Sequence, residues 1–143
     1  MKREFLTYKQ SIDMRAIGFN EPCLAYYDKD GDFLGDISVN EDTDNLYTNA
    51  DFVMYQDFKV ADVSAPTFSQ AFRWFREKYE LTSEVCVEQY RRKTNKKWMF
   101  SITYLNEDAM YEHSKTTFEN YEEAELACLN KLIEIVKDEK KNS

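Results

Sequence analysis

The feature that most constrains this sequence is the change of period between residues 67 and 137. An amphipathic helical pattern comes first, three strand-like segments follow, and a second helical pattern closes the segment. Apolar side chains recur every three or four residues in a helix and at every second residue in a strand. This half of the chain therefore predicts a helix, three strands and a helix. The connections 92–97 and 106–109 are short, which favours an antiparallel meander.

The first of these helices begins at a capping box, Thr67-Phe68-Ser69-Gln70, directly after Pro66. In this motif the hydroxyl and the amide side chains bind the first free backbone N–H groups. Its apolar stripe consists of Phe68, Ala71, Phe72, Phe75 and Tyr79. Three phenylalanines on one stripe predict a major contribution to the core. Trp74 lies at the edge of the stripe, and either core packing or an exposed aromatic patch with Trp98 is consistent with that position.

The three strands are predicted over 83–91, 98–105 and 110–118, the last as a half-exposed edge strand. The final helix begins at Asn120, with Glu123 completing another capping box. Its apolar face comprises Ala124, Cys128, Leu129, Leu132, Ile135 and Val136. The charged tail beyond Lys137 is expected to fray.

The first 65 residues predict smaller elements. Thr7-Tyr8-Lys9-Gln10 is a capping box, and the helix it opens has an apolar stripe of Tyr8, Ile12, Ala16 and Phe19 that ends near Gly18. Strands are predicted over 23–27 and 33–39, joined by a turn at Asp30-Gly31. A loop over 40–50 and a short strand over 52–55 complete this part.

Together these patterns predict one α+β domain over 1–143. A short N-terminal helix and a β-hairpin with an acidic loop region occupy 1–65. An αβββα unit occupies 66–137, with its antiparallel meander packed on two helices, and 138–143 form the tail.

Negative charge is concentrated in one segment. The net charge is −8, and residues 28–62 hold ten acidic side chains against two basic ones. Duplex binding depends on Lys and Arg, so an acidic chain repels nucleic acid by default. The segment is interpreted either as a solvated loop that aids solubility or as a binding surface.

The opposite charge gathers at the predicted hairpin tip over 91–97. Its five cations are Arg91, Arg92, Lys93, Lys96 and Lys97, and Trp98 follows at once. Such a prong is suited to contact nucleic acid or an acidic protein surface. The alternative is a solvated turn balanced by the chain's own acidic region.

Patterns for catalysis and metal binding do not reach the required spacing. An EF-hand loop that began at Asp28 would need glycine at its sixth position and glutamate at its twelfth. Glycine is fourth here and Val39 is twelfth, which favours a plain hairpin turn. His113, the single histidine, is expected to face solvent in a strand, and the cysteines lack zinc-site spacing. We therefore expect a non-enzymatic protein with no catalytic residues, metal or cofactor.

The cysteines and the absence of targeting signals indicate a compartment. Cys23, Cys86 and Cys128 are expected to be free thiols in a reducing environment. No apolar run approaches membrane-spanning length, and the N-terminus lacks a signal-peptide pattern. The expectation is a cytoplasmic protein with no membrane partner.

The αβββα order over 67–137 resembles the double-stranded RNA-binding fold in topology. In that family the last helix opens with a lysine cluster that grips phosphates. The matching positions here read Asn120-Tyr121-Glu122-Glu123-Ala124-Glu125. Carboxylates at a phosphate site repel RNA, so the family's function is not carried over.

Three segments resemble short proteins encoded by phages and mobile elements of gut Bacteroidetes: 18–23, 65–79 and 121–137. This resemblance implies a phage accessory protein and brings no activity with it. The leading hypothesis is a module that binds a host or phage protein. The alternative is a nucleic-acid binder that uses the basic 91–97 hairpin, and edge strands make a homodimer possible.

Overall fold

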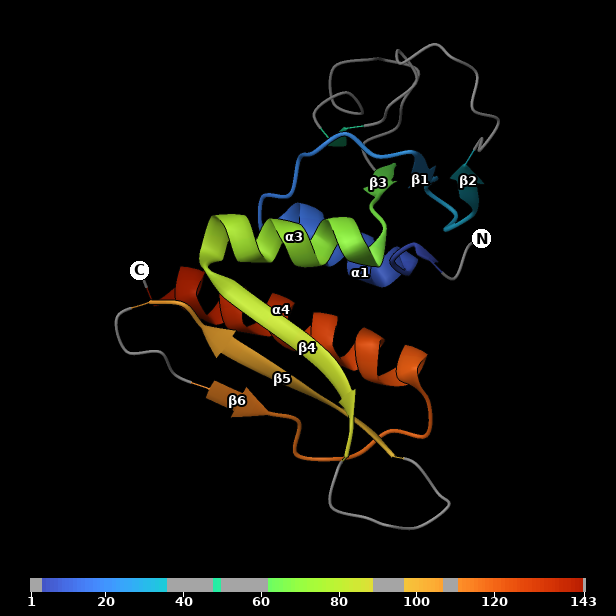
Figure 1. Cartoon of the computed structure of the whole chain (residues 1–143). Coiled ribbons are helices and arrows are strands. Elements are labelled where there is room, and N and C mark those ends of the chain that lie inside the picture. The colour runs from blue at the N-terminus through green and yellow to red at the C-terminus, as the bar shows by residue number, and fades with distance from the viewer. Residues whose placement is uncertain (1–3, 36–47, 50–61, 89–96, 107–110, 143) are drawn as a thin grey trace. The chain divides into compact units, whose positions relative to one another are not determined.

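The computed structural model describes residues 4–35, 48–49, 62–88, 97–106 and 111–142 (Figure 1). The fold is α+β, as predicted, and its contacts group the chain into two compact units, 1–70 and 71–143. The helices within the described residues are α1 (Tyr8–Ala16), α3 (Phe68–Tyr79) and α4 (Tyr121–Lys141). The strands described form two three-stranded antiparallel sheets.

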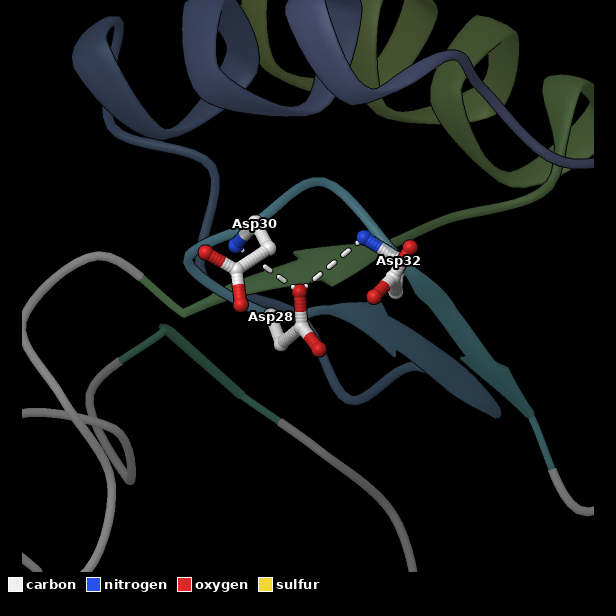
Figure 2. A group of neighbouring side chains, drawn as sticks. All are labelled: Asp28, Asp30 and Asp32. Atoms are coloured by element: carbon white, nitrogen blue, oxygen red, sulfur yellow. Dashed lines mark hydrogen bonds between the residues drawn. The ribbon is translucent and has the colours of Figure 1, made fainter.

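The first sheet confirms the predicted hairpin. Strand β1 (Ala25–Tyr27) lies between β2 (Phe33–Gly35) and β3 (Val63–Ala65). In the turn, the Asp28 carboxylate accepts hydrogen bonds from the N–H groups of Asp30 and Asp32 at 2.9 and 3.0 Å (Figure 2). Gly31 adopts a φ of 82°, which glycine tolerates without steric cost. The remainder of the strand predicted over 33–39 lies outside the described residues.

Strand β3 was not predicted, because three residues between Asp62 and Pro66 are too few to show a period. The strand predicted over 52–55 lies outside the described residues, as does most of the loop predicted over 40–50. From that loop, Asn49 is described and is buried. Its amide donates to the Phe19 carbonyl at 2.7 Å and accepts from the Ser64 N–H at 2.9 Å. This side chain therefore satisfies two separate backbone groups.

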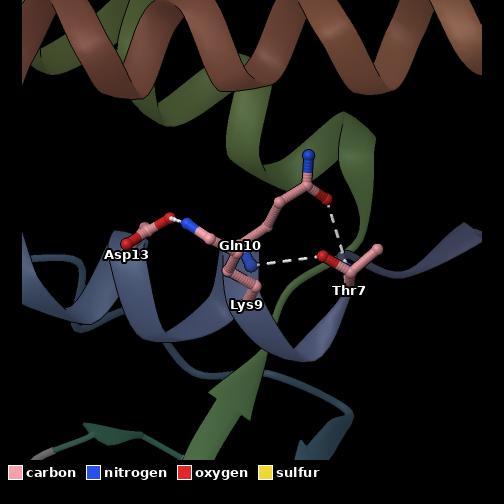
Figure 3. Close-up of polar contacts among 4 residues, drawn as sticks. All are labelled: Thr7, Lys9, Gln10 and Asp13. Carbon is pink, nitrogen blue, oxygen red and sulfur yellow. Dashed lines mark hydrogen bonds and ion pairs between the residues drawn. The ribbon is translucent and has the colours of Figure 1, made fainter.

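Helix α1 has its predicted capping box. The Thr7 hydroxyl accepts from the Gln10 N–H and the Gln10 amide accepts from the Thr7 N–H, each at 3.2 Å (Figure 3). On the next turn Lys9 pairs with Asp13 at 3.1 Å.

The stripe predicted along α1 is confirmed in part. Phe19 is buried, and the half-buried Tyr8 and Ile12 pack against the core. Ala16 is exposed, and the helix also buries Gln10, Ser11 and Met14. Polar Gln10 can be buried here because the cap engages its amide.

The core of the first unit is a small aromatic and aliphatic cluster. Phe5, Ala25, Tyr27, Val63 and Ala65 are buried together, with Tyr8, Ile12 and Phe33 packed against them. The ring centroids of Phe5 and Tyr27 lie 5.2 and 5.4 Å from that of Phe33. The buried Tyr27 hydroxyl donates to the Leu6 carbonyl at 2.7 Å, which fixes the chain entering α1.

Helix α3 begins where its sequence predicts, and the Thr67 hydroxyl accepts from the Gln70 N–H at 3.1 Å. The Gln70 amide also donates to the Pro22 carbonyl at 2.8 Å. The buried face is displaced from the predicted stripe toward Trp74: Trp74 and Phe75 are buried, whereas Phe72 and Tyr79 are half-buried.

The predicted antiparallel meander is confirmed. The second sheet has the order β4 (Leu81–Val87), β5 (Trp98–Tyr104) and β6 (Tyr111–His113) (Figure 1). Val85 lies opposite Phe100 in this sheet. Strand β6 is an edge strand, as expected, but it is shorter than 110–118. After His113 the Ser114 N–H still bonds the Phe100 carbonyl, and the chain leaves the sheet until Phe118 pairs with Trp98.

Helix α4 buries the predicted face and covers β4 and β5. The Asn120 side chain accepts from the Glu123 N–H at 2.8 Å. The Glu123 carboxylate accepts from the Glu119 N–H rather than from that of Asn120. The helix continues to Lys141 instead of ending near Lys137, and lysines in its last turn complement the helix dipole.

The three cysteines are free: Cys23 and Cys128 are buried and Cys86 is half-buried. Within the described ranges, no helix combines the length and the apolar character that crossing a membrane requires.

Candidate functional site

The best candidate for a site lies at the base of the predicted basic hairpin. Of the predicted site residues, Arg91, Arg92, Lys93 and Lys96 lie outside the described residues, whereas Lys97 and Trp98 are described. The structure brings these two beside the segment that enters α4. We call Lys97, Trp98, Phe118, Glu119 and Tyr121 the hairpin-base cluster.

Backbone pairing sets the position of this cluster. The Trp98 N–H donates to the Phe118 carbonyl and the Phe118 N–H donates to the Trp98 carbonyl, both at 2.8 Å. This two-way bridge holds the start of β5 against the segment before α4. Side chains that are about twenty residues apart in sequence thereby become neighbours.

The aromatic rings of the cluster pack edge to face. The Trp98 and Tyr121 ring centroids are 5.4 Å apart with an interplanar angle of 87°. Phe118 stacks on Phe100 at 6.1 Å. Tyr121 remains 40% exposed and Trp98 is half-buried, so both rings keep accessible surface. Such edge-to-face pairs stabilise ring orientation beyond simple burial.

An ion pair flanks the rings. The Lys97 ammonium contacts the Glu119 carboxylate, and the Lys97 side chain is the more buried of the two. A surface pair of this kind contributes about 0–1 kcal/mol to stability. Its main effect is to place one positive and one negative charge at fixed positions beside the aromatic surface.

Carboxylates at the start of α4 shape the electrostatics of the cluster. Burial raises the pKa of Tyr121, and the nearby Glu125, which accepts its hydrogen bond, raises this pKa further. Burial likewise raises the pKa of Glu125. Tyr121 is thus a neutral hydrogen-bond donor at neutral pH, next to a helix turn that also carries Glu122 and Glu123. This turn disfavours phosphate.

Trp74, the remaining predicted site residue, is 5% exposed. Its ring packs against Phe75 and Tyr79 at centroid distances of 5.1 and 5.3 Å, and the Lys78 ammonium lies 5.2 Å from the ring centroid. These contacts favour the core alternative over an exposed patch shared with Trp98.

Two other sequence features have plain structural roles. The carboxylate oxygens of Asp28, Asp30 and Asp32 lie within 4.8 Å of one another, but Asp28 uses one oxygen to hold the turn through two N–H groups (Figure 2). His113 faces solvent, as predicted, with its ring edge to face with Tyr111 at 4.1 Å.

Sequence reasoning missed Glu119 and Tyr121 as members of the cluster. Both precede or open a helix, where their residue types fit a helix start and indicate nothing further. The β-branched and polar composition of 110–118 suggested a continuous strand, and only its interruption after His113 brings Phe118 opposite Trp98.

No protein-family model matches the chain, and neither the curated proteins nor the solved structures that were compared include a significant match.

Proposed function

We propose that this chain is a non-enzymatic protein-binding module, an accessory factor of the phage type that engages a host or phage protein through the hairpin-base cluster. The carrying observation is the half-exposed Trp98–Tyr121 pair beside the Lys97–Glu119 ion pair. The resemblance to proteins of Bacteroidetes phages and mobile elements supports the accessory role.

The physical argument rests on what makes a surface bind tightly. Tryptophan and tyrosine are enriched among residues that dominate interface energies. The Trp98 and Tyr121 rings are already packed against each other, which limits the entropy lost on binding. Fixed opposite charges at the rim add orientation and specificity more than affinity.

A nucleic-acid binder is the second candidate, and the observation that favours it is the run of five cations over 91–97. Two observations weigh against nucleic-acid binding. Lys97, the last of these cations, is paired with Glu119. The adjoining first turn of α4 carries Glu122 and Glu123, which repel phosphate.

A gel shift with single- and double-stranded DNA and RNA at low salt tests the second candidate. We expect no shift. A shift that Lys96→Glu/Lys97→Glu abolishes would replace protein binding with nucleic-acid binding as the function.

Affinity capture from a phage-infected host lysate tests the first candidate. The bait proteins are the wild type, Tyr121→Ala and the control Tyr111→Ala, since Tyr111 is also exposed (55%) but lies outside the cluster. We expect a protein retained by the wild type and by Tyr111→Ala to be lost with Tyr121→Ala. Titration calorimetry with that purified protein should show at least about a tenfold weaker Kd for Tyr121→Ala. Equal affinity for all three baits would exclude the cluster as the binding surface.

A further inference from the structure

Among the described residues, no strand pairs with the outer edge of β4. Strand β4 has seven residues and, within the described part of the chain, pairs only with β5. The opposite edge strand, β6, has three residues. Natural sheets keep exposed edges short or otherwise protected, because unpaired N–H and C=O groups recruit another strand. The β4 edge therefore stands out as a place where a further strand can add.

The ladder shows which backbone groups face outward. The Glu88 N–H donates to the Lys97 carbonyl and the Leu105 N–H donates to the Glu80 carbonyl, both at 2.8 Å. In an antiparallel ladder, residues that face the partner alternate with residues that face away. In β4, the even-numbered residues therefore direct their backbone N–H and C=O groups toward β5. Ser83, Val85 and Val87 direct theirs toward the outer edge of the sheet. No described residue forms a hydrogen bond with these outward groups.

Charges on the strand select how it can pair with itself. An antiparallel pair centred on Glu84 would place two Glu84 side chains directly opposite each other. A pair centred on Cys86 would place Glu84 opposite Glu88 twice. Like charges opposite each other are destabilising. A pair centred on Val85 avoids both of these like-charge contacts, because it places Glu84 opposite Cys86 and Glu88 opposite Thr82.

We propose that two copies of this chain dimerise by antiparallel pairing of their β4 edges about Val85, which joins their second sheets into one. The occupant of the edge is a second copy because the strand is complementary to itself in this register: outward backbone groups meet outward backbone groups, and no glutamate lies opposite another glutamate. This surface is separate from the hairpin-base proposal, so either can fail alone.

Light scattering after size exclusion, over a wide range of protein concentration, tests dimerisation directly. Val85→Pro removes one outward N–H and leaves the β4–β5 bonds of Glu84 and Cys86 in place. We expect the wild type and the control Val85→Ala, which keeps the N–H, to dimerise, and Val85→Pro to be monomeric. A wild type that is monomeric throughout would overturn the proposal.

A disulfide tests the register without a proline. In a Cys86→Ser background, Val85→Cys should form a cross-linked dimer on mild oxidation, because paired Cα atoms about 5.5 Å apart allow a disulfide. Glu84→Cys in the same background should stay monomeric on a non-reducing gel. Cross-linking through Glu84→Cys instead would overturn the Val85-centred register.

Discussion

At the scale of single residues, Glu80 has a backbone conformation that conflicts with its side chain. It ends α3 with a φ of 56°, the left-handed region, and its carbonyl accepts the Leu105 N–H at 2.8 Å. A non-glycine residue there costs about 1–2 kcal/mol. The position follows the last helical residue, where glycine is the usual choice.

We therefore predict that Glu80→Gly stabilises the protein by about 0.5–1 kcal/mol, after the greater freedom of glycine in the unfolded chain is subtracted. Glu77→Gly is the matched control: the same substitution in the exposed body of α3 should destabilise by about 0.5–1 kcal/mol. Urea unfolding gives the change in the free energy of unfolding for both variants. Destabilisation by Glu80→Gly would show that the Glu80 side chain makes a contribution larger than its backbone strain.

At the scale of elements, helices α3 and α4 were predictable because each spans at least three turns, so that their apolar periods and caps reinforce each other. Strand β3 was not, since three residues show no period. The α1 stripe is confirmed at Tyr8, Ile12 and Phe19 but not at Ala16. Burial of Gln10 was not predicted, because it depends on the cap rather than on apolar character.

The hairpin-base cluster, too, was predictable only in part. Lys97 and Trp98 were singled out from charge and aromatic character, which are local properties. Their partners Glu119 and Tyr121 depend on the bridge between Trp98 and Phe118, which no local pattern encodes. Sequence period indicates that an element has a buried face, but it does not encode where a strand stops and returns.

Helix α4 supplies a pH-dependent prediction. The pKa of Glu125 is raised in the folded state, mainly by burial. The folded state then binds this proton more tightly than the unfolded state does. Its contribution to stability is fully present below the unfolded pKa and is lost as pH rises through the folded pKa.

Replacing the Glu125 carboxylate by a neutral amide should remove this loss of stability at higher pH. Glu125→Gln is expected to raise the melting temperature relative to wild type at pH 7 and to leave it little changed at pH 4, while the amide oxygen still accepts from Tyr121. Glu122→Gln, in the same turn, separates this effect from the general benefit of removing one negative charge. An equal gain at both pH values would contradict a raised Glu125 pKa.

At the scale of the whole molecule, the two units differ in charge. Residues 1–70 contain 6 basic and 13 acidic side chains, whereas 71–143 contain 13 and 14, so the net charge of −8 comes almost entirely from the first unit. The second unit, which carries both proposed surfaces, is nearly neutral. The second unit by itself therefore exerts little net-charge repulsion on a protein partner or on its own copy.

Three thiols distributed over both units allow the packing of the whole molecule to be tested in one experiment. Burial raises the pKa of Cys23 and of Cys128 to about 12. Cys86 is half-buried on β4, and its pKa is raised as well. Because the thiolate is the nucleophile, a raised pKa and burial both slow alkylation.

We predict that iodoacetamide at pH 8 modifies Cys86 first in the native protein, and Cys23 and Cys128 at least about a hundredfold more slowly, because their modification requires local opening. Peptide mass spectrometry over time gives the three rates, and the unfolded protein in denaturant should show similar rates for all three. Cys86→Ser should abolish the fast phase only. Fast modification of Cys23 would mean that the first unit opens readily, and fast modification of Cys128 would mean the same for the face that α4 buries. If β4 pairs with a second copy as proposed, Cys86 should also become less reactive as protein concentration rises, which links the thiol rates to the dimer.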